Sequence, residues 1–301
     1  DFRAKAGVGP GTFQPGQIFS PPFVNSQKPI LADLNNDGRL DFAVPQETGG
    51  NKIDIFFAGA GGTFSAAPSL VLNTLAPPKN IIAADFNNDG IVDIAAVNYG
   101  TNQTIELWIP PTPGAFPAAM PNFTITGGCL GARNIAAADM NGDGNLDIVS
   151  GCDGADNINV WLGNGNGSFQ PVVAVSSGVG MIGSMFVNDI ALGDFDNDGD
   201  IDLVCTNDVT NRMRIMLNQG NGTFLLGSLF SGVNYHTLAL ADFNDDGNLD
   251  IAVSAYGVNQ VRVLLGDGTG AFPIMDSYAA GSNIRGITAA DFNGDGRMDI
   301  A

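Results

Sequence analysis

The chain of 301 residues contains few basic residues and no long hydrophobic run. It has twelve lysines and arginines and 31 acidic residues, and the formal net charge is −19. The basic residues are scattered and form no stripe, which argues against a nucleic acid as a partner. No run of about eighteen apolar residues occurs, so no segment is expected to insert into a membrane.

The residue patterns that carry most enzyme chemistry are also missing. His236 is the single histidine, and neither Gly-x-Ser-x-Gly nor His-Glu-x-x-His occurs. A lone histidine rarely forms a catalytic triad. We therefore expect a protein that is not an enzyme, and keep as an alternative a polysaccharide lyase-like activity that uses Tyr, Arg or His236.

Acids are instead concentrated in a nine-residue pattern, seen at 242–250. Oxygen-bearing side chains stand at positions 1, 3, 5 and 9, and Gly247 at position 6 permits a sharp turn that offers the carbonyl of position 7 inward. Calcium takes six to eight oxygen ligands, and the EF-hand also places a glycine at its sixth position. The closing acid here stands at position 9 without a Glu at 12, and the flanks read as strands. The pattern predicts a calcium loop that is not an EF-hand.

The loop occurs six times, with first residues 52, 54, 55, 48 and 49 positions apart. A fixed period near 50 residues is typical of propellers, solenoids and arrays. Taking positions 1, 3, 5, 7 and 9, the candidate metal ligands are Asp33, Asn35, Asp37, Arg39, Asp41, Asp85, Asn87, Asp89, Ile91, Asp93, Asp139, Asn141, Asp143, Asn145, Asp147, Asp194, Asp196, Asp198, Asp200, Asp202, Asp242, Asn244, Asp246, Asn248, Asp250, Asp291, Asn293, Asp295, Arg297 and Asp299.

These loops account for most of the charge of the chain. Nineteen of the 31 acids stand at positions 1, 3, 5 or 9, and six divalent cations would offset much of the net charge. Positions 2 and 8 are always apolar, and we expect both to anchor each loop to a core. The acidity therefore indicates metal sites more than a polyanionic surface.

Between the loops the sequence predicts four short strands per repeat, A to D, with the metal loop between A and B. Gly-rich turns before a phenylalanine separate C from D, as expected for antiparallel sheets. The fold class is all-β: a single-domain β-propeller over 1–301, with six four-stranded blades. The closing blade takes strands C and D from 1–19 and strands A and B from 285–301, which removes exposed sheet edges. A seventh blade in a longer parent chain, or pairing of the ends between molecules, stays open.

The pattern Ala-Asp-Phe-Asn-x-Asp-Gly-x-x-Asp-Ile-Ala, within 84–97 and 241–253, resembles the FG-GAP or VCBS-type repeat of integrin α-subunit propellers and bacterial exported proteins. The resemblance covers nearly the whole chain. It implies about six structural Ca²⁺ ions, bound by the side chains at positions 1, 3, 5 and 9 and the carbonyl of position 7. Asp196 departs from the usual Asn, which should raise the affinity of the fourth site. Related propellers serve adhesion, carbohydrate binding and, in some cases, lyase chemistry, so the fold alone does not select the function.

In this topology the A–B and C–D turns share one face and the B–C and D–A loops share the other. We expect a ligand on the second face, where the candidates are Tyr99, Arg133, Arg212, Tyr235, His236, Tyr256 and Arg285. The tyrosines could stack on sugars or be rim residues with nothing bound. The predicted function is a calcium-stabilised extracellular binding or adhesion module for a glycan or protein. The alternative is a structural subunit of an extracellular assembly or filament.

Other features are compatible with an exported protein. The chain starts at Asp1 without Met, as a processed or excised segment would, and extracellular calcium levels suit weak sites. Cys129 and Cys152 fall on the same face of the third blade, so we predict a disulfide between them. Cys205 is expected to be a buried free thiol, and Trp108 and Trp161 to be packing residues.

Two further features leave alternatives open. Glycosylation sequons occur at Asn102, Asn122, Asn166 and Asn221, the last two in turns whose chemistry alone would produce them. The apolar insertion 178–187 could contact a partner in self-assembly, as could the termini, or it could fold back over its own blade.

Overall fold

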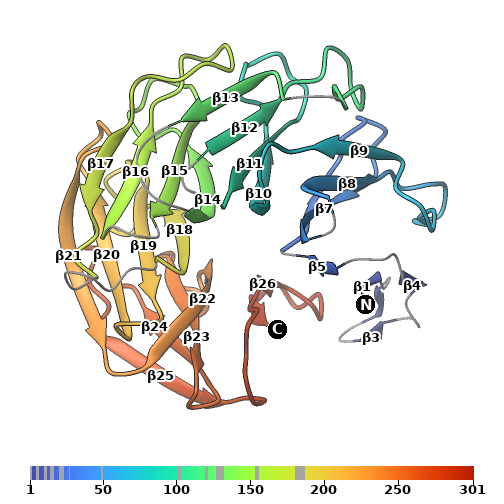
Figure 1. Cartoon of the computed structure of the whole chain (residues 1–301). Coiled ribbons are helices and arrows are strands. Elements are labelled where there is room, and N and C mark those ends of the chain that lie inside the picture. The colour runs from blue at the N-terminus through green and yellow to red at the C-terminus, as the bar shows by residue number, and fades with distance from the viewer. Residues whose placement is uncertain are drawn as a thin grey trace.

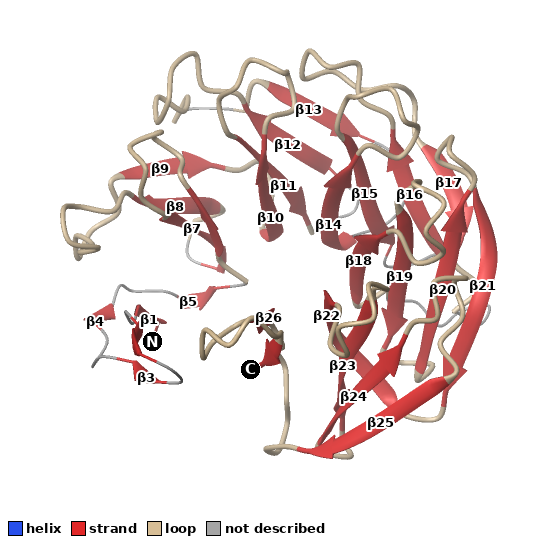
Figure 2. Cartoon of the chain, turned by 180° about the vertical axis from the view of Figure 1, so that it is seen from behind, coloured by secondary structure: helices blue, strands red, loops and turns tan. Residues whose placement is uncertain are grey.

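The structure is a computed structural model. It describes residues 28–48, 50–99, 104–118, 121–126, 132–152, 156–179 and 187–301, and the backbone of short strands between residues 2 and 26. Every regular element in these residues is a strand (Figure 2). Within the same residues no helix is long and apolar enough to cross a membrane.

Antiparallel sheets of four consecutive strands stand around a common centre as the blades of a propeller (Figure 1). In blade 1 the first strand is divided into two segments, which both pair with β7. The strands of blade 1 are β5 (Val24–Ser26), β6 (Ile30–Ala32), β7 (Asp41–Thr48), β8 (Lys52–Phe56) and β9 (Leu70–Asn73). Those of blade 2 are β10 (Pro78–Ala84), β11 (Asp93–Asn98), β12 (Thr104–Trp108) and β13 (Phe123–Thr126).

The next three blades repeat this order from the centre outward. Blade 3 contains β14 (Ala132–Ala138), β15 (Asp147–Cys152), β16 (Asn157–Trp161) and β17 (Val173–Ser176). Blade 4 contains β18 (Asp189–Gly193), β19 (Asp202–Asn207), β20 (Arg212–Asn218) and β21 (Phe224–Ser231). Blade 5 contains β22 (Asn234–Ala241), β23 (Asp250–Tyr256), β24 (Gln260–Leu265) and β25 (Ile274–Ala279). The all-β propeller predicted from the repeat is confirmed.

The two ends of the chain supply further hairpins. At the C-terminal end β26 (Ala289–Ala290) pairs with β27 (Asp299–Ile300), as expected for strands A and B of a sixth blade. At the N-terminal end β1 (Phe2–Ala4) pairs with β4 (Gln17–Phe19), and β2 (Gly7–Gly9) with β3 (Thr12–Phe13). Among the described pairings β27 pairs with β26 alone. Closure of the ring by 1–19 against 285–301 therefore stays a prediction.

Burial follows the position of a strand within its blade. The second strands β11, β15 and β19 are buried along their whole length, whereas the fourth strands β13 and β17 are mostly exposed. A strand covered on both faces reads as a continuous apolar run instead of an alternating one. Ile94 to Val97 is such a run.

Most of the hydrophobic core lies between neighbouring blades, and one small cluster, Phe42, Val44 and Phe56, lies within blade 1. One cluster joins Leu34 and Ile53 of blade 1 to Ile94 and Trp108 of blade 2, and three more clusters join blades 2 to 3, 3 to 4 and 4 to 5. Trp108 and Trp161 are buried in these clusters, so their predicted packing role is confirmed.

The anchors of the metal loops behave differently at positions 2 and 8. At position 2, Leu34, Phe86, Met140 and Phe195 are buried, as predicted. At position 8 the expectation is wrong for Leu40 and Met298, which are 61% and 38% exposed. Position 8 packs on the preceding blade: a Cβ added at Gly193 of blade 4 would meet the Leu249 side chain at 2.3 Å. Leu40 belongs to blade 1, and no described blade precedes blade 1 for it to pack against.

Candidate metal loops and a central pocket

All six aspartate-rich loops adopt the same backbone path. The glycine at position 6 has a φ between +81° and +94° in each loop, as the sequence predicts. Position 4 also has a positive φ, which the sequence analysis missed. The residues there are Asn36, Asn88, Gly142, Asn197, Asp245 and Gly294. Asn, Asp and Gly are the residues that tolerate this left-handed conformation, so the signal was present in the sequence.

The first aspartate of each loop is held by the loop's own backbone. Its Oδ2 accepts the amide of the position-6 glycine at 2.7–3.0 Å in all six loops. In the sixth loop the amides of Gly296, Gly294 and Asp295 hold the pKa of Asp291 below its ordinary value. This carboxylate therefore stays ionised and points into the loop.

The fourth loop has the densest set of carboxylates among the described residues. Ligand oxygens of Asp194, Asp196 and Asp202 lie within 4.8 Å of one another. The Oδ1 atoms of Asp194 and Asp196 are buried without a hydrogen-bond partner in the described structure. Burial, with the charges of Asp198 and Asp194, raises the pKa of Asp196. Unpartnered oxygens that repel one another suit a hard divalent cation.

The other loops place an asparagine at position 3, and its amide relieves this repulsion. Asn87, Asn141 and Asn244 each donate from Nδ2 to the position-5 carboxylate, at 2.8, 2.9 and 2.9 Å. Their Oδ1 atoms face back into the loop and accept the position-5 amide. These loops thus offer oxygen ligands as well, with one charge fewer than the fourth loop.

The aspartate at position 9 has a second role that the sequence analysis missed. Its Oδ2 accepts the position-2 amide, and its Oδ1 accepts an amide from the end of the third strand of the same blade. For Asp250 the donors are Phe243 and Gly266, both at 2.8 Å. Asp41, Asp147 and Asp202 bind the equivalent amides of Ala58, Gly163 and Asn218. These buried carboxylates join the A–B loop to the C–D turn, so both lie on one face.

Blade 2 breaks this pattern because of one proline. Pro110 occupies the place of Ala58, Gly163, Asn218 and Gly266, and proline has no N–H to donate. The Oδ1 of Asp93 is consequently buried without a partner among the described residues. Burial raises the pKa of Asp93 to about 7. A cation ligated by this oxygen would supply the missing partner.

Neighbouring loops also contact one another. In three pairs of successive loops the position-4 side chain of one loop contacts the position-7 side chain of the next. Asn88 donates to Asn145 and Asn197 donates to Asn248, both at 2.9 Å, and Arg297 pairs with Asp245 at 3.2 Å. In the first loop Arg39 instead pairs with Asp37 of its own loop. These contacts between loops link the second loop to the third, the fourth to the fifth and the fifth to the sixth on one face of the propeller.

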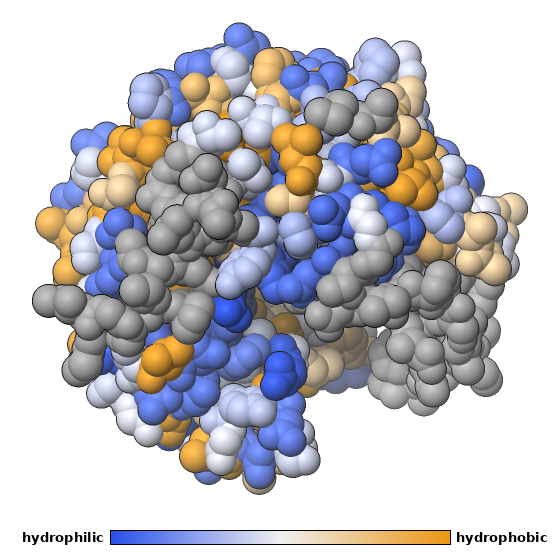
Figure 3. Space-filling view, viewed as in Figure 1, coloured by the Kyte–Doolittle hydropathy of each residue, from blue (hydrophilic) through white to orange (hydrophobic). Residues whose placement is uncertain are grey.

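The opposite face has a pocket of about 580 Å³ at the centre of the ring. The first strands of the blades line it, near the points where the D–A loops enter them. It contains four of the twelve lysines and arginines and the only histidine: Lys28, Lys79, Arg133, Arg285 and His236. Hydrophilic residues border the middle of the ring in the space-filling view (Figure 3). Arg133, His236 and Arg285 were predicted for this face, and the structure brings them together.

A repeated irregularity of the backbone coincides with these residues. The register of the first strand against the second shifts between Pro78 and Asn80, between Ala132 and Ile135, and between Tyr235 and Leu238. Such bulges redirect side chains and are frequent at binding sites. Lys79, Arg133 and His236 stand within the three shifts.

Hydrogen bonds between blades fix the wall of the pocket. Asn80 donates to Asn134 Oδ1 at 2.7 Å, Asn134 donates to the carbonyl of Asn188, and Asn188 donates to the carbonyl of His236 at 2.8 Å. This belt runs through blades 2 to 5. Asp189, the one acid in the lining, accepts the amides of Leu238 at 2.9 Å and Ile190 at 3.1 Å.

The aromatic candidates divide into two groups. Tyr99 lies under the Nζ of Lys79 at 4.9 Å, and Tyr256 lies between Arg285, at 5.4 Å, and His236, at 5.8 Å. Tyr235 does not belong to the face: it is 1% exposed, packs in the core between blades 4 and 5, and accepts a hydrogen bond from Arg262 at 3.0 Å. The backbone shift that begins at Tyr235 explains why it is buried while its neighbour His236 lines the pocket.

Burial lowers the pKa of His236, and the charges of Arg285 and Arg133 lower it further against the opposing effect of Asp208. The imidazole is therefore neutral at pH 7, and the positive charge of the pocket comes from the lysines and arginines. Arg212, the remaining candidate, begins β20 and does not line the pocket.

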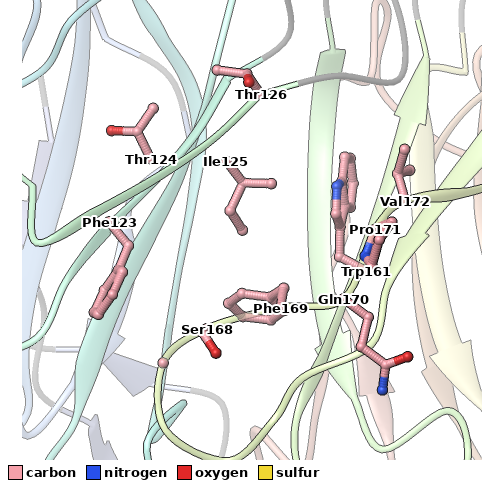
Figure 4. A pocket seen from close by; sticks show the side chains of 11 residues that line it. Phe123, Thr124, Ile125, Thr126, Trp161, Ser168, Phe169, Gln170, Pro171 and Val172 are labelled. Carbon is pink, nitrogen blue, oxygen red and sulfur yellow. The ribbon is translucent and has the colours of Figure 1, made fainter.

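A second hollow of about 410 Å³ lies between blades 2 and 3 (Figure 4). Strand β13 forms one wall, with Phe123 and Ile125, and the C–D turn of blade 3 forms the other, with Phe169 and Gln170. Trp161 is buried beneath it. No charged residue lines this hollow, in contrast to the central pocket.

The remaining predicted sites lie partly outside the described residues. Cys129 and Asn102 are among these, so the disulfide with Cys152 and glycosylation there stay predictions. Cys205 is buried as a free thiol, as predicted. Of the insertion 178–187, Val179 and Val187 are buried between blades 3 and 4, and 180–186 lie outside the described residues.

A ring of four-stranded antiparallel blades, each with an aspartate-rich loop after its first strand, defines a β-propeller built from one repeat. The FG-GAP-like repeat matches residues 33–96, 85–150, 139–205, 194–253 and 242–301, and the chain belongs to this family. No curated protein matches the chain.

Solved structures share the fold at low sequence identity. A lectin from Agrocybe aegerita that recognises non-reducing terminal N-acetylglucosamine is 22% identical, with a TM-score of 0.65 over 99% of this chain and 78% of that one. BBS1N, solved in complex with ARL6DN, is 13% identical, with a TM-score of 0.60 over 89% and 73%. A candidate 6-phosphogluconolactonase from Bacteroides uniformis is 14% identical, with a TM-score of 0.61 over 84% and 71%. These likenesses concern the fold alone.

Proposed function

We propose that this chain is a calcium-stabilised extracellular module that binds a glycan through the central pocket. The observation that carries the proposal is the separation of two faces in an FG-GAP propeller. Converging carboxylates occupy one face, and a rigid polar pocket of about 580 Å³ occupies the other. That volume falls in the range of about 300–1,000 Å³ found for small-ligand sites. The lectin with a similar fold supports a glycan as the ligand.

The residues present fit calcium. Each loop offers the side-chain oxygens of positions 1, 3, 5 and 9 and the carbonyl of position 7, and the fourth loop and Asp93 have buried oxygens without a described partner. Bound Ca²⁺ would supply positive charge that holds these carboxylates together. With the ion bound, each loop would act as a structural link between strands A, B and C.

Chelation tests the calcium part of the proposal. Extracellular-type sites with Kd of ~10⁻⁴ M in ~1 mM free Ca²⁺ contribute roughly 1.4 kcal/mol each, or about 8 kcal/mol for six. For a chain of this size EDTA should then lower Tm by roughly 10 °C or more. Calorimetry in EDTA, with Mg²⁺ and Ca²⁺ added back separately, measures this. Equal Tm values with and without Ca²⁺ would contradict it.

A glycan array tests the binding part. Intact protein in 1 mM Ca²⁺ should bind a defined subset of glycans, and Arg285→Gln should lose that binding while Gln170→Ala, in the hollow between blades 2 and 3, retains it. The reverse pattern would move the site to the hollow. Binding to no glycan would refute the proposed function.

Three alternatives remain testable beside this one. BBS1N was solved in a protein complex, which favours a protein ligand as the second candidate. Filaments or lateral ring contacts in electron micrographs would support a structural subunit instead. Turnover of a polysaccharide that depends on His236 would support the lyase-like alternative.

A further inference from the structure

We propose that the central pocket recognises an anionic saccharide, whose carboxylate or sulfate oxygens bind Lys28, Arg133 and Arg285. This inference rests on the proposed function and adds the class of ligand. It follows from three features of the pocket: its charge, the state of its neutral polar groups, and its rigidity.

The charge of the pocket is opposite to that of the chain. With a net charge of −19, the chain has only twelve lysines and arginines, yet four of them line this one pocket beside a single acid. Asp189, that acid, is 6% exposed, and its oxygens are engaged by two backbone amides. Lys79 pairs with Glu47. Neither Lys28 nor Arg285 forms an ion pair within 4 Å of any described residue, although the charge of Lys28 also acts on Asp189. Both cationic groups can therefore contact a ligand.

The neutral polar groups of the wall are already hydrogen-bonded. The amide nitrogen atoms of Asn80, Asn134 and Asn188 form the belt between blades, and the Thr237 hydroxyl contacts Ser254 Oγ at 2.8 Å. Neutral sugars are recognised mainly by such amide and hydroxyl groups. Because these groups are engaged within the protein, the charged ends of Lys28 and Arg285 are the principal groups left to contact a ligand.

The pocket is also preorganised for this contact. The belt holds the first strands of blades 2 to 5, including the one that carries Arg133, and the Tyr256 ring contacts the Arg285 guanidinium at 5.4 Å. Guanidinium groups bind carboxylate and sulfate oxygens in a bidentate manner, which adds geometric selectivity to charge. A ligand then loses little affinity to ordering of the site.

Calorimetric titration with three saccharides tests the proposal: glucuronate, glucose 6-sulfate and glucose. One or both anionic sugars should bind at least about tenfold more tightly than glucose, since a charged hydrogen bond contributes about 1.5–3 kcal/mol. Whichever of glucuronate and glucose 6-sulfate binds identifies the carboxylate or the sulfate as the source of the anionic oxygens. The affinity should fall as salt is raised from 50 to 500 mM.

Single substitutions locate the site. Lys28→Gln and Arg285→Gln should each weaken binding of the anionic sugar about tenfold. Lys52→Gln changes the charge equally but outside the pocket, where Lys52 pairs with Asp54 at 3.0 Å, and should bind as wild type does. Unchanged melting curves for the three variants would exclude misfolding as the cause.

Several results would overturn the inference. Equal affinity for glucose and both anionic sugars, or pocket variants that bind as Lys52→Gln does, would leave the proposed glycan binding in place and remove the anionic ligand. Inorganic sulfate that binds as tightly as either anionic sugar would show an anion site that does not recognise a saccharide. Failure to bind any saccharide in this titration and on the glycan array would remove the proposed function as well.

Discussion

The hydrogen bond between a position-9 aspartate and the C–D turn can be tested by comparing two blades. Asp250 makes this hydrogen bond, and Asp93 does not. Asp250→Asn should destabilise the chain in EDTA, where no cation contributes. Both Asp250 oxygens accept buried amides at 2.8 Å, and an asparagine can accept only one. The Gly266 N–H would then face an amide NH₂. Loss of a charged hydrogen bond and one unsatisfied donor should together cost about 3 kcal/mol.

Asp93→Asn is the matched variant, and it should change stability by less than about 1 kcal/mol in EDTA. Its one described amide partner, Phe86 at 2.8 Å, can be kept by the asparagine oxygen. The other oxygen has no partner to lose, because Pro110 has no N–H. Restoring the donor with Pro110→Ala should stabilise the chain by about 1 kcal/mol, provided that the backbone there is unchanged.

Thermal unfolding followed by circular dichroism, with identical native spectra as the control, distinguishes the variants. Asp250→Asn should lower Tm by about 5 °C and Asp93→Asn by less than about 2 °C. With 1 mM Ca²⁺ present, both variants should also lose part of the contribution of the ion at their own loop. Equal losses in EDTA for the two variants would refute the role assigned to the C–D turn amides.

Two further predictions concern the packed interior. Burial raises the pKa of Glu106 to about 7, above its ordinary 4.5, so the folded chain binds a proton between these values that the unfolded chain releases. The contribution of Glu106 to stability should thus fall by up to about 3 kcal/mol as pH rises from 4.5 to 7. Glu106→Gln should remove this part of the pH dependence and leave the part due to Asp93 and Asp202, whose pKa values burial also raises. Urea melts at pH 5 and 8 check it, and an unaltered pH dependence would contradict it. Gly163→Ala should cost more than about 2 kcal/mol, because its Cβ would meet the Leu146 carbonyl oxygen at 2.2 Å. Gly61→Ala, at φ +76° in open space, should cost only about 1 kcal/mol, and similar losses for both would argue against the clash.

Much of the fold was predictable because each repeat contains residues that mark its loops and turns. The glycine at position 6 marks the loop, and the Gly-rich turn before a phenylalanine marks the end of strand C. Because strand direction alternates, these two signals alone place loops and turns on one face. The burial of Leu34 and Phe86 at position 2 follows from the same reasoning.

The errors arose where a residue depends on a neighbour that the sequence does not identify. Leu40 and Leu249 both stand at position 8 of their loops. Leu249 packs against blade 4, whereas no described blade precedes Leu40. Tyr235 follows a D–A loop and was expected on the surface. The backbone shift that starts there changes which side chain faces inward, and neither composition nor alternation reveals such a shift.

The residues of the pocket and the exceptional position of Asp93 could have been found in the sequence, but their roles could not. Lys79, Arg133, His236 and Arg285 each stand six residues before the first aspartate of a loop, so alignment of the repeats would have grouped them. Pro110 would likewise have stood out against Ala58 and its counterparts. The roles of these basic residues and of Pro110 could not be inferred from the sequence. They depend on the start of strand A facing the axis and on the end of strand C lying beside position 9.

The same six-residue spacing explains how an acidic chain can keep a basic pocket. Six residues of extended strand span about 20 Å, which separates the pocket from the ring of carboxylates. At physiological ionic strength the Debye length is about 8 Å, so most of the field of those carboxylates is screened before it reaches the pocket. The net charge of −19 therefore describes one face and does not predict what the other face binds. If the two faces are electrically independent in this way, calcium affects the anion site through the stability of the blades, and a folded variant lacking one loop carboxylate should keep the selectivity of the pocket.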